Sequence, residues 1–249
     1  MNQYTRTKII IGDAFDELRN KTVCVFGIGG VGGYVVEALA RSGIGHLILV
    51  DHDDVDLTNI NRQIIANLDT IGEDKVDVMK KRIASIDPNI KVEAKKMFYL
   101  PETRDAFDFA SYDYVVDAVD TVKAKVDLIV ECKKAGTPII SSMGMGNKID
   151  PEMIHIDDIS HTKVDPLAKV MRHELKKRHI QRCMVCYSTE KPITPNYDEE
   201  MLSEMKESAK QGRRKATPGS IAFVPSVAGL MMAGYVVRDL AHLKAVKGA

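Results

Sequence analysis

Glycines crowd the end of an apolar stretch near the N-terminus. Residues 23 to 33 read Val-Cys-Val-Phe-Gly-Ile-Gly-Gly-Val-Gly-Gly, and a second apolar stretch ends in Asp51. A backbone without side chains lets a diphosphate approach the N–H groups at a helix start, and a carboxylate about 20 residues later can bind the ribose hydroxyls. The pattern therefore predicts a nucleotide site at Gly27, Gly29, Gly30, Gly32 and Asp51.

The loop that follows this carboxylate carries groups suited to a chain of phosphates. It reads His-Asp-Asp-Val-Asp-Leu-Thr-Asn-Ile-Asn-Arg-Gln and offers, besides Asp53, the side chains of Asn59, Arg62 and Gln63. A dinucleotide needs no further cation here, whereas the outer phosphates of a triphosphate do, and arginine binds phosphates bidentately. The alternative is a solvated loop in which Arg62 pairs with Asp53 or Asp56.

Further along the chain, one lysine and two carboxylates could act on phosphates. Lys75 begins a predicted helix, where its ammonium can neutralise charge on the reacting phosphate, although a single surface lysine is more often only solvated. Asp117 and Asp120 end an apolar strand, and carboxylates with this spacing can hold Mg²⁺ against phosphate oxygens. We favour Asp120 as the metal ligand; the alternative is that it caps the following helix.

The elements that would position these groups alternate between strand and helix. Strands are predicted at 22–27, 46–51, 91–97, 114–118 and 138–143, with helices at 31–42, 74–85, 103–110 and 122–135. Apolar runs without polar alternation indicate strands buried on both faces. The predicted fold class is therefore α/β, a Rossmann-like, doubly wound, mostly parallel sheet with helices on both faces.

We interpret the chain as a single domain, 1–249, in three parts. An N-terminal helix within 1–20 precedes the nucleotide-binding core at 21–150, and residues 151–249 form a basic extension for substrate binding and dimerisation. In the extension we expect strands at 153–159 and 183–188 and a basic helix at 166–178. A partly mobile surface loop with one short helix follows at about 190–219, and a strand and a helix close the chain.

The composition is typical of a cytoplasmic globular protein. Its 249 residues are 45% apolar and 28% charged with no net charge, and the first residues lack the apolar stretch of a signal peptide. The stretch 221–237 is apolar enough to suggest a membrane span, but Pro225, Gly229 and Gly234 interrupt it. We interpret it as a buried strand and helix or a subunit contact rather than a bilayer segment.

Cysteine usage argues against a structural zinc. Cys24 and Cys132 fall inside apolar elements, which leaves Cys183 and Cys186 as the one pair with metal-ligand spacing. Tetrahedral zinc needs four ligands, and neither a second pair nor a suitably spaced histidine completes the set. Packing is therefore favoured over metal binding for this pair.

Two short segments concentrate positive charge. The first, 169–182, has a net charge of +5 and the second, 206–215, of +4, so the rest of this neutral chain carries −9. Such a contrast is typical of a polyanion-binding face, and the few aromatic residues among the cations favour a structured RNA held by its phosphates. The alternative is two solvated helices. The candidate contacts are Lys169, Arg172, Lys176, Lys177, Arg178, Arg213, Arg214 and Lys215.

In their order and spacing, the glycine turn, the loop 51–63, Gly-Glu-Asp-Lys and Asp-Ala-Val-Asp resemble the ThiF/MoeB/HesA family, bacterial relatives of ubiquitin-activating enzymes. The match covers roughly residues 4–160. The family uses ATP and Mg²⁺ to adenylate a carboxylate and releases diphosphate. The resemblance implies that Asp51 binds the ribose, that Asp120 holds Mg²⁺ and that Lys75 serves the reacting phosphate. The phosphates would be bound by Asn59, Arg62 and Gln63.

The N-terminus extends this resemblance to a second subunit. Tyr4-Thr-Arg6 is similar to a family segment whose arginine reaches the ATP of the partner, which implies a homodimer with Arg6 acting in trans. One departure is Thr121, where many members carry Asn, and it leaves that polar contact open.

The second half resembles one branch of the family, the tRNA threonylcarbamoyladenosine dehydratases. The similarity lies in the motif from Gly144 to Pro151, in the basic helix, and in Cys-Tyr-Ser-Thr-Glu-Lys-Pro from Cys186. It implies ATP-dependent cyclisation of threonylcarbamoyladenosine in tRNA, with sulfur-relay or desulfurase-type proteins as candidate partners. The alternatives are an adenylyltransferase for a ubiquitin-like sulfur carrier, an NAD-dependent oxidoreductase and a nucleotide-binding scaffold without catalysis.

Overall fold

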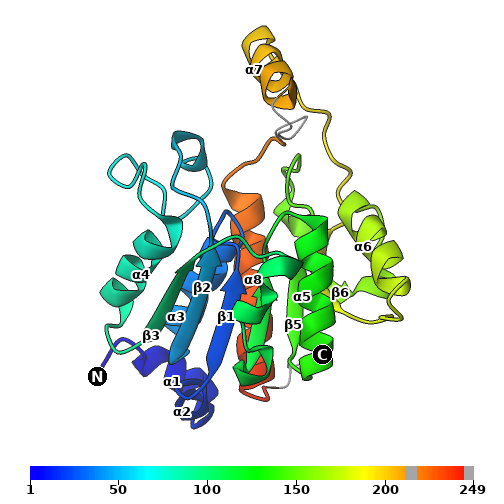
Figure 1. The fold of residues 1–249 in the computed structure, drawn as a ribbon. Helices are drawn as coiled ribbons and strands as arrows, with labels where there is room; N and C mark the ends of the chain where they lie inside the picture. The colour runs from blue at the N-terminus through cyan, green and yellow to red at the C-terminus, as the bar shows by residue number, and fades with distance from the viewer. Residues whose placement is uncertain (211–217, 244–249) are drawn as a thin grey trace.

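Seven strands form one sheet in the order β3-β2-β1-β4-β5-β7-β6, and all neighbours are parallel except β6 with β7 (Figure 1). This computed structural model describes residues 1–210 and 218–243. The strand order reverses between β1 and β4, which is where open α/β sheets bind ligands. The strands are β1 Thr22–Phe26, β2 His46–Asp51, β3 Lys91–Lys96, β4 Tyr114–Asp117, β5 Ile139–Ser142, β6 Ile154–Asp158 and β7 Met184–Ser188.

Helices cover both faces, so the predicted α/β class is confirmed (Figure 1). Successive strand residues face opposite sides. Val25 therefore packs with α3, α4 and α8 on one face, whereas Phe26 packs with α5 and α6 on the other. The helices are α1 Thr5–Ile11, α2 Ala14–Leu18, α3 Gly32–Ser42, α4 Lys75–Ile86, α5 Val122–Ala135, α6 Pro166–Lys176, α7 Glu199–Lys210 and α8 Phe223–Leu240.

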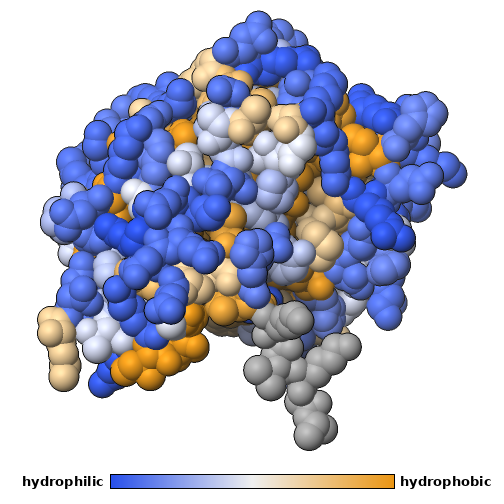
Figure 2. Space-filling model, turned by 90° about the horizontal axis from the view of Figure 1, so that it is seen from below, coloured by the Kyte–Doolittle hydropathy of each residue, from blue (hydrophilic) through white to orange (hydrophobic). Residues whose placement is uncertain are grey.

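The N-terminal helix predicted within 1–20 is two helices, because Gly12 adopts a φ of +59° and ends α1. Tyr4 anchors this end of the chain: its hydroxyl donates to Asp87 Oδ2 at 2.8 Å. Helix α1 itself buries no residue, and its Ile9 and Ile10 are 79% and 83% exposed. Helix α1 lies at the lower end of the molecule in Figure 1, and the view from that side shows hydrophobic residues among hydrophilic ones (Figure 2).

The helix predicted at 103–110 is wrong: two 3₁₀ segments, Pro101–Ala106 and Phe109–Ser111, take its place. The physical reason is an aromatic cluster. Phe107 lies 5.0 Å from Phe26 between ring centroids, and Phe109 stacks on the same ring. Two residues spaced by two face the same way only in an extended backbone, and Phe107 has φ −127° and ψ 124°.

The final strand before the last helix is also absent: residues 221 and 222 lead directly into α8. Pro225 stands in its first turn, where a missing N–H costs nothing. By length and composition α8 could cross a membrane, but it packs as a core helix against α3 and the sheet. The extension thus shares the sheet of the core through β6 and β7. In the predicted loop 190–219, α7 has 12 residues and is longer than the short helix expected there.

Two glycines of α8 provide a test of this packing. A Cβ at Gly229 would lie 2.4 Å from the carbonyl oxygen of Val31, whereas a Cβ at Gly234 would meet nothing within 4 Å. We expect Gly229→Ala to lower the free energy of unfolding by about 1–3 kcal/mol through overpacking. Gly234→Ala should raise it by up to about 1 kcal/mol, because alanine favours helix. Urea unfolding of both variants measures this, and equal effects would contradict close packing of α8 on α3.

Candidate nucleotide and nucleic-acid sites

The glycine turn connects β1 to α3 and leaves no room for side chains at two positions. Gly27 has a φ of +87°, and a Cβ there would lie 2.6 Å from the carbonyl oxygen of Ala118. A Cβ at Gly32 would lie 1.7 Å from the carbonyl oxygen of Gly27. The backbone of the turn thus rests directly on the loop after β4, which brings the loops of the two strands on either side of the reversal into contact.

Asp51 ends β2 beside this turn. Its carboxylate accepts the N–H of Ile28 at 2.6 Å and the N–H of Asp53 at 2.9 Å. One bond therefore ties the end of β2 to the glycine turn, and the other shapes the start of the following loop. This places the predicted ribose ligand beside the glycine turn, at the carboxyl ends of the strands where the strand order reverses. We call this place, defined by the glycine turn, Asp51 and the loop after β2, the nucleotide crevice.

The loop after β2 folds back over the glycine turn. A Cβ at Gly30 would lie 3.4 Å from Cγ of Arg62, and one at Gly29 would lie 3.9 Å from Nε2 of Gln63. Asn59 is buried, and its Oδ1 accepts the N–H of Asp56 at 3.2 Å. Gln63 is also buried, and its Oε1 has no hydrogen-bond partner among the described residues. The structure therefore places Arg62 and Gln63 beside the turn, whereas Asn59 bonds within its own loop.

Arg62 and Lys75, the two cations predicted to bind phosphate, already have partners within this chain. Arg62 Nη1 donates to the carbonyl oxygen of Thr58 and to Asn61 Oδ1, both at 2.9 Å, and burial lowers the pKa of its guanidinium. Lys75 is 5% exposed, and its Nζ lies 2.8 Å from Asp53 Oδ2. The alternative of a solvated surface lysine is wrong for Lys75, which is buried. Arg62 bonds within its own loop and also interacts with the charge of Asp56, so the alternative given for it is not overturned.

The two carboxylates after β4 have different environments. Asp117 is fully buried and accepts hydrogen bonds from Lys125 Nζ at 3.1 Å and from the Ser141 hydroxyl. Asp120 is exposed, so it is the one of the two that can offer a carboxylate to a metal from solvent. Thr121 occupies the N-cap position of α5, so the alternative of Asp120 as the cap is wrong. Lys125 was not identified from the sequence as the partner of Asp117. The signal that could have found it is its position on the apolar side of the predicted helix 122–135.

Arg6 lies far from the nucleotide crevice of its own chain. Helix α1, which carries it, sits at the end of the sheet where the strands begin (Figure 1). Tyr4, two residues earlier, hydrogen-bonds to Ala40 and Asp87, at the C-terminal ends of α3 and α4. The glycine turn is at the opposite end of α3. Within one chain the structure does not bring Arg6 to the other candidate residues.

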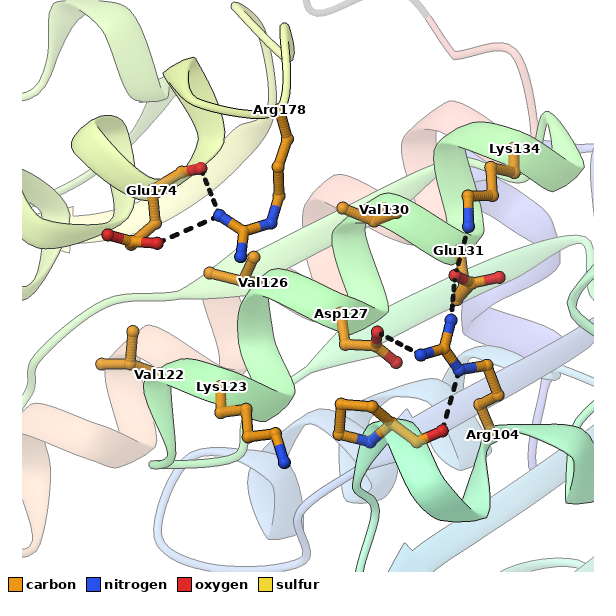
Figure 3. Close-up of a pocket in the computed structure, with 11 residues that line it drawn as sticks. Arg104, Val122, Lys123, Val126, Asp127, Val130, Glu131, Lys134, Glu174 and Arg178 are labelled. Carbon is orange, nitrogen blue, oxygen red and sulfur yellow. Dashed lines mark hydrogen bonds and ion pairs between the residues drawn. The ribbon is translucent and has the colours of Figure 1, made fainter.

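The predicted nucleic-acid contacts on α6 fall into two groups. Lys169 and Lys176 are exposed, whereas the guanidinium of Arg172 donates to the carbonyl oxygen of Thr162 at 2.9 Å. Arg178 and Lys177 pair with Glu174, and Figure 3 shows Arg178 and Glu174 facing the cleft between α6 and α5. The predicted contacts Arg213, Arg214 and Lys215 lie outside the described residues.

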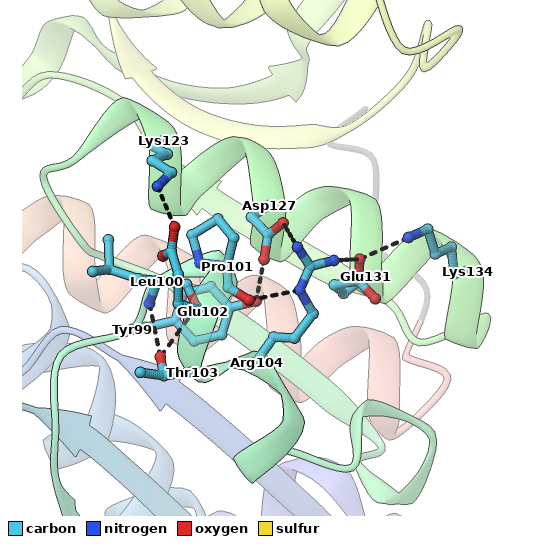
Figure 4. A network of polar contacts seen from close by, with 10 residues as sticks. All are labelled: Tyr99, Leu100, Pro101, Glu102, Thr103, Arg104, Lys123, Asp127, Glu131 and Lys134. Carbon is cyan, nitrogen blue, oxygen red and sulfur yellow. Dashed lines mark hydrogen bonds and ion pairs between the residues drawn. The ribbon is translucent and has the colours of Figure 1, made fainter.

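The opposite wall of that cleft is held by its own ion pairs. Arg104 lies 2.9 Å from Glu131 and 3.3 Å from Asp127, which also accepts the hydroxyl of Tyr99 at 2.8 Å (Figure 4). Lys134 completes the network at Glu131. The charges that line this wall therefore neutralise one another and fasten the 3₁₀ segment 101–106 to α5, which is a structural role.

Cys183 and Cys186 are buried on opposite faces of the sheet. Cys183 packs with α5 and α6, and Cys186 with α3 and α8. The two thiols therefore cannot bind one metal ion together, as expected from their alternation along a strand. Burial raises the pKa of each thiol to about 12, so both stay protonated at neutral pH.

The fold is an α/β sheet whose switch point carries a glycine turn, the strand-end carboxylate Asp51, and the loop with Arg62 and Gln63, which is the arrangement typical of nucleotide-binding α/β proteins. The family model that matches residues 2–248 is the ThiF family, and the chain belongs to it. The chain is 49% identical to a tRNA threonylcarbamoyladenosine dehydratase of Bacillus subtilis over 96% of this chain and 95% of that protein. It is 44% identical to one of Escherichia coli over 62% of this chain and 58% of that protein.

Solved structures agree with this family. The crystal structure of the E. coli tRNA N6-threonylcarbamoyladenosine dehydratase TcdA in complex with ATP superposes with a TM-score of 0.84 at 31% identity, and covers 99% of this chain and 96% of that one. TcdA in complex with AMP gives the same TM-score. E. coli MccB, 21% identical with a TM-score of 0.64, shares the fold.

The cysteine environments predict a specific reactivity. All four thiols are buried, so we expect none to react with Ellman's reagent at pH 8 in the folded protein and all to react in urea. Ser203→Cys, on the exposed surface of α7, should react at once and serves as the positive control. Rapid labelling of the folded wild-type protein would contradict the burial of its thiols.

The raised thiol pKa values also predict how stability depends on pH. The pKa of an unfolded thiol is 9.0, whereas that of folded Cys183 and Cys186 is about 12. The free energy of unfolding should therefore fall as the pH rises above 9.

Proposed function

We propose that the chain is an ATP-dependent tRNA threonylcarbamoyladenosine dehydratase, in which the threonyl carboxylate is adenylated and then cyclised. The main support is the position of Arg62 and Gln63 beside the glycine turn. Lys75 is held by Asp53, two residues after the strand end that binds this turn. The sequence identity to dehydratases along nearly the whole chain supports the choice of substrate.

The proposed reaction has two steps. A threonyl carboxylate oxygen attacks the first phosphate of ATP, and the bond to diphosphate breaks. The carbamoyl group of the same nucleoside then attacks the activated carbonyl carbon, a five-membered ring closes, and AMP leaves. One water is lost overall, so no nucleophile of the protein is required. Ring closure within one molecule profits from a high effective molarity.

The protein supplies charge and position. On binding ATP, Arg62 would exchange the oxygens of Thr58 and Asn61 for phosphate oxygens, which are stronger acceptors. Lys75 is aimed by Asp53 and would share its ammonium with the reacting phosphate, where fixed charge is worth most. Mg²⁺ brought with ATP would be held by Asp120 and would neutralise phosphate charge.

The position of Arg6 supports a homodimer. For Arg6 to bind phosphate, it must reach the ATP of another copy, because α1 lies at the far end of its own sheet. The same helix exposes Ile9 and Ile10, which a partner subunit would cover. We therefore propose that α1 rests on the partner and delivers Arg6 to the ATP there.

The outer surface of α6 supports a polyanion site. Its N-terminus lies near the end of β5, because Asp165 caps it and also binds Lys148. Lys169 and Lys176 are then exposed along the length of the helix. A tRNA whose modified nucleoside enters the crevice would meet these cations through its backbone.

The carrier-protein reading is less supported. E. coli molybdopterin-synthase adenylyltransferase is 32% identical over 57% of this chain, whereas the B. subtilis dehydratase is 49% identical over 96% of it. The NAD-dependent reading is weaker still, because the solved relative TcdA holds ATP and AMP. A sulfur-relay or desulfurase-type partner and a cytoplasmic location stay predictions.

Incubation with ATP, Mg²⁺ and modified tRNA tests the proposal. Mass spectrometry of the nucleosides should show threonylcarbamoyladenosine losing one water while AMP forms. Lys75→Ala should lower the rate by about 10²–10³-fold, as removal of one preorganised charge donor does. Lys80→Ala, on the exposed side of the same helix, is the matched control and should keep the full rate. AMP without the mass change, or with a carrier protein in place of tRNA, would refute the assignment.

Mixed dimers test whether Arg6 acts in trans. Arg6→Ala and Lys75→Ala should each be inactive alone. Co-expressed, they should recover about a quarter of the wild-type rate, because half of randomly assembled dimers are mixed and one of their two sites is intact. Arg6 acting in its own chain would give no recovery, and this outcome would sink the in-trans role.

A further inference from the structure

The segment that carries Arg6 is held to its own subunit by the side chain of Tyr4. Tyr4 is 4% exposed, whereas helix α1, which follows it, buries none of its residues, and Arg6 is exposed. The Tyr4 hydroxyl donates to Asp87 Oδ2 at 2.8 Å and lies 3.2 Å from the carbonyl oxygen of Ala40. Its ring lies 4.9 Å from that of Phe15, the next buried residue along the chain. We call these contacts the Tyr4 anchor.

The carboxylate that accepts this hydroxyl is buried and has several donors. Asp87 is 1% exposed; its Oδ1 accepts the backbone N–H and the side-chain amide of Asn89, and its Oδ2 also accepts Nη1 of Arg19 at 2.9 Å. Burial alone would raise the pKa of Asp87, but the hydrogen bonds from Asn89, Tyr4 and Arg19 lower it. The acceptor is therefore charged at neutral pH, and a hydrogen bond to a charged group is about twice as strong as one between neutral groups.

The partners of Tyr4 belong to the two helices that begin at the nucleotide crevice. Helix α3 begins after the glycine turn and has Ala40 near its end, and α4 begins at Lys75 and ends before Asp87. Eleven residues of α3 at about 1.5 Å each span about 16 Å. The Tyr4 anchor and the crevice therefore lie at opposite ends of the same helices (Figure 1).

This framework fixes α1 relative to the crevice of its own chain. In a dimer with two-fold symmetry, each subunit presents the same surface to the other in the same geometry. A fixed place for α1 on one subunit is then also a fixed place for Arg6 at the crevice of the partner. The side chain nearest to Arg6 that sets this place is Tyr4, two residues earlier.

We propose that Tyr4 is a positioning residue for Arg6 and that it acts on the ATP site of the partner subunit, an inference that rests on the proposed function. Arg6 keeps its place only while the Tyr4 anchor holds the start of α1. The contacts of Tyr4 lie at the far ends of α3 and α4, so loss of its hydroxyl leaves the crevice of its own chain intact. A change at Tyr4 should therefore slow the reaction on the other subunit.

A pair of tyrosine variants separates this role from general stability. Tyr4→Phe keeps the ring against Phe15 and removes one of the donors to Asp87. Tyr99→Phe is the matched control: Tyr99 is also 4% exposed and donates to an aspartate, Asp127 Oδ2, at 2.8 Å, but it packs on the opposite face of the sheet. Both variants thus lose one buried hydrogen bond to a carboxylate.

Steady-state kinetics with modified tRNA give the first readout. For Tyr4→Phe we expect kcat to fall about three- to tenfold, as for loss of one hydrogen bond, with the KM for tRNA unchanged. Tyr99→Phe should keep the wild-type kcat, although urea unfolding should show a similar loss of stability in both variants. An equal fall of kcat in the two variants would show a general structural effect and would overturn the positioning role.

Mixed dimers show on which subunit Tyr4 acts. Chains with two different affinity tags are co-expressed, dimers that carry both tags are purified, and Lys75→Ala inactivates one of the two sites. With Tyr4→Phe and Lys75→Ala on different chains, the active site receives Arg6 from an intact Tyr4 anchor and should match the dimer of wild-type and Lys75→Ala chains. With both substitutions on one chain beside a wild-type chain, the active site receives Arg6 from the altered anchor and should be about three- to tenfold slower.

The possible results distinguish failure of this role from failure of the proposed function. If the wild type removes no water from modified tRNA, the proposed function fails. If Arg6→Ala and Lys75→Ala chains do not restore activity to each other, the in-trans arginine fails. If they do, but the two Tyr4→Phe mixed dimers have equal rates or the dimer with separated substitutions is the slower, Tyr4 does not position Arg6 for the partner.

Discussion

The contact between the glycine turn and the loop after β4 is the constraint on which the crevice depends. Because Gly27 and Gly32 have no side chains, the backbone after β1 reaches the backbone after β4 without a spacer. That contact sets the distance between the phosphate-binding turn and the loop that bears Asp120. On its other side the turn supports α8 at Gly229, so the same backbone also locates the C-terminal helix.

The cations near the carboxyl ends of the strands already have partners within the protein. Lys75 rests on Asp53 and Lys125 on Asp117, while Arg62 donates to neutral oxygens. A buried cation without a partner would be costly, so each is neutralised or hydrogen-bonded before substrate arrives. The pairs differ in burial: Asp117 is closed off with Lys125, whereas Asp53 is about half exposed. Lys125 and Asp117 therefore form a structural pair, whereas the proposed function has Lys75 share its ammonium with a phosphate.

The extension is joined to the core through the same sheet. Strands β7 and β6 continue it beyond β5, and the buried pair of Lys148 and Asp165 connects the loop after β5 to α6. The proposed tRNA surface and the ATP crevice are therefore parts of a single framework rather than two linked domains. A reaction that joins a large RNA to a small nucleotide requires this kind of fixed geometry.

Local sequence determined the elements whose patterns are strong. Strands β1 and β2 and helix α5 fall within about one residue of prediction, since apolar runs and capping residues act over short distances, and the glycine turn, Asp51 and Arg62 follow from their motifs. Tertiary packing decided the rest. The aromatic cluster around Phe26 replaced a predicted helix with 3₁₀ segments. Cys183 and Cys186 lie apart because they pack on opposite faces of the sheet. Two hydrogen bonds between Asn147 and Gly219 join residues 72 positions apart. No local pattern encodes such contacts, because each depends on which segments the completed sheet brings together.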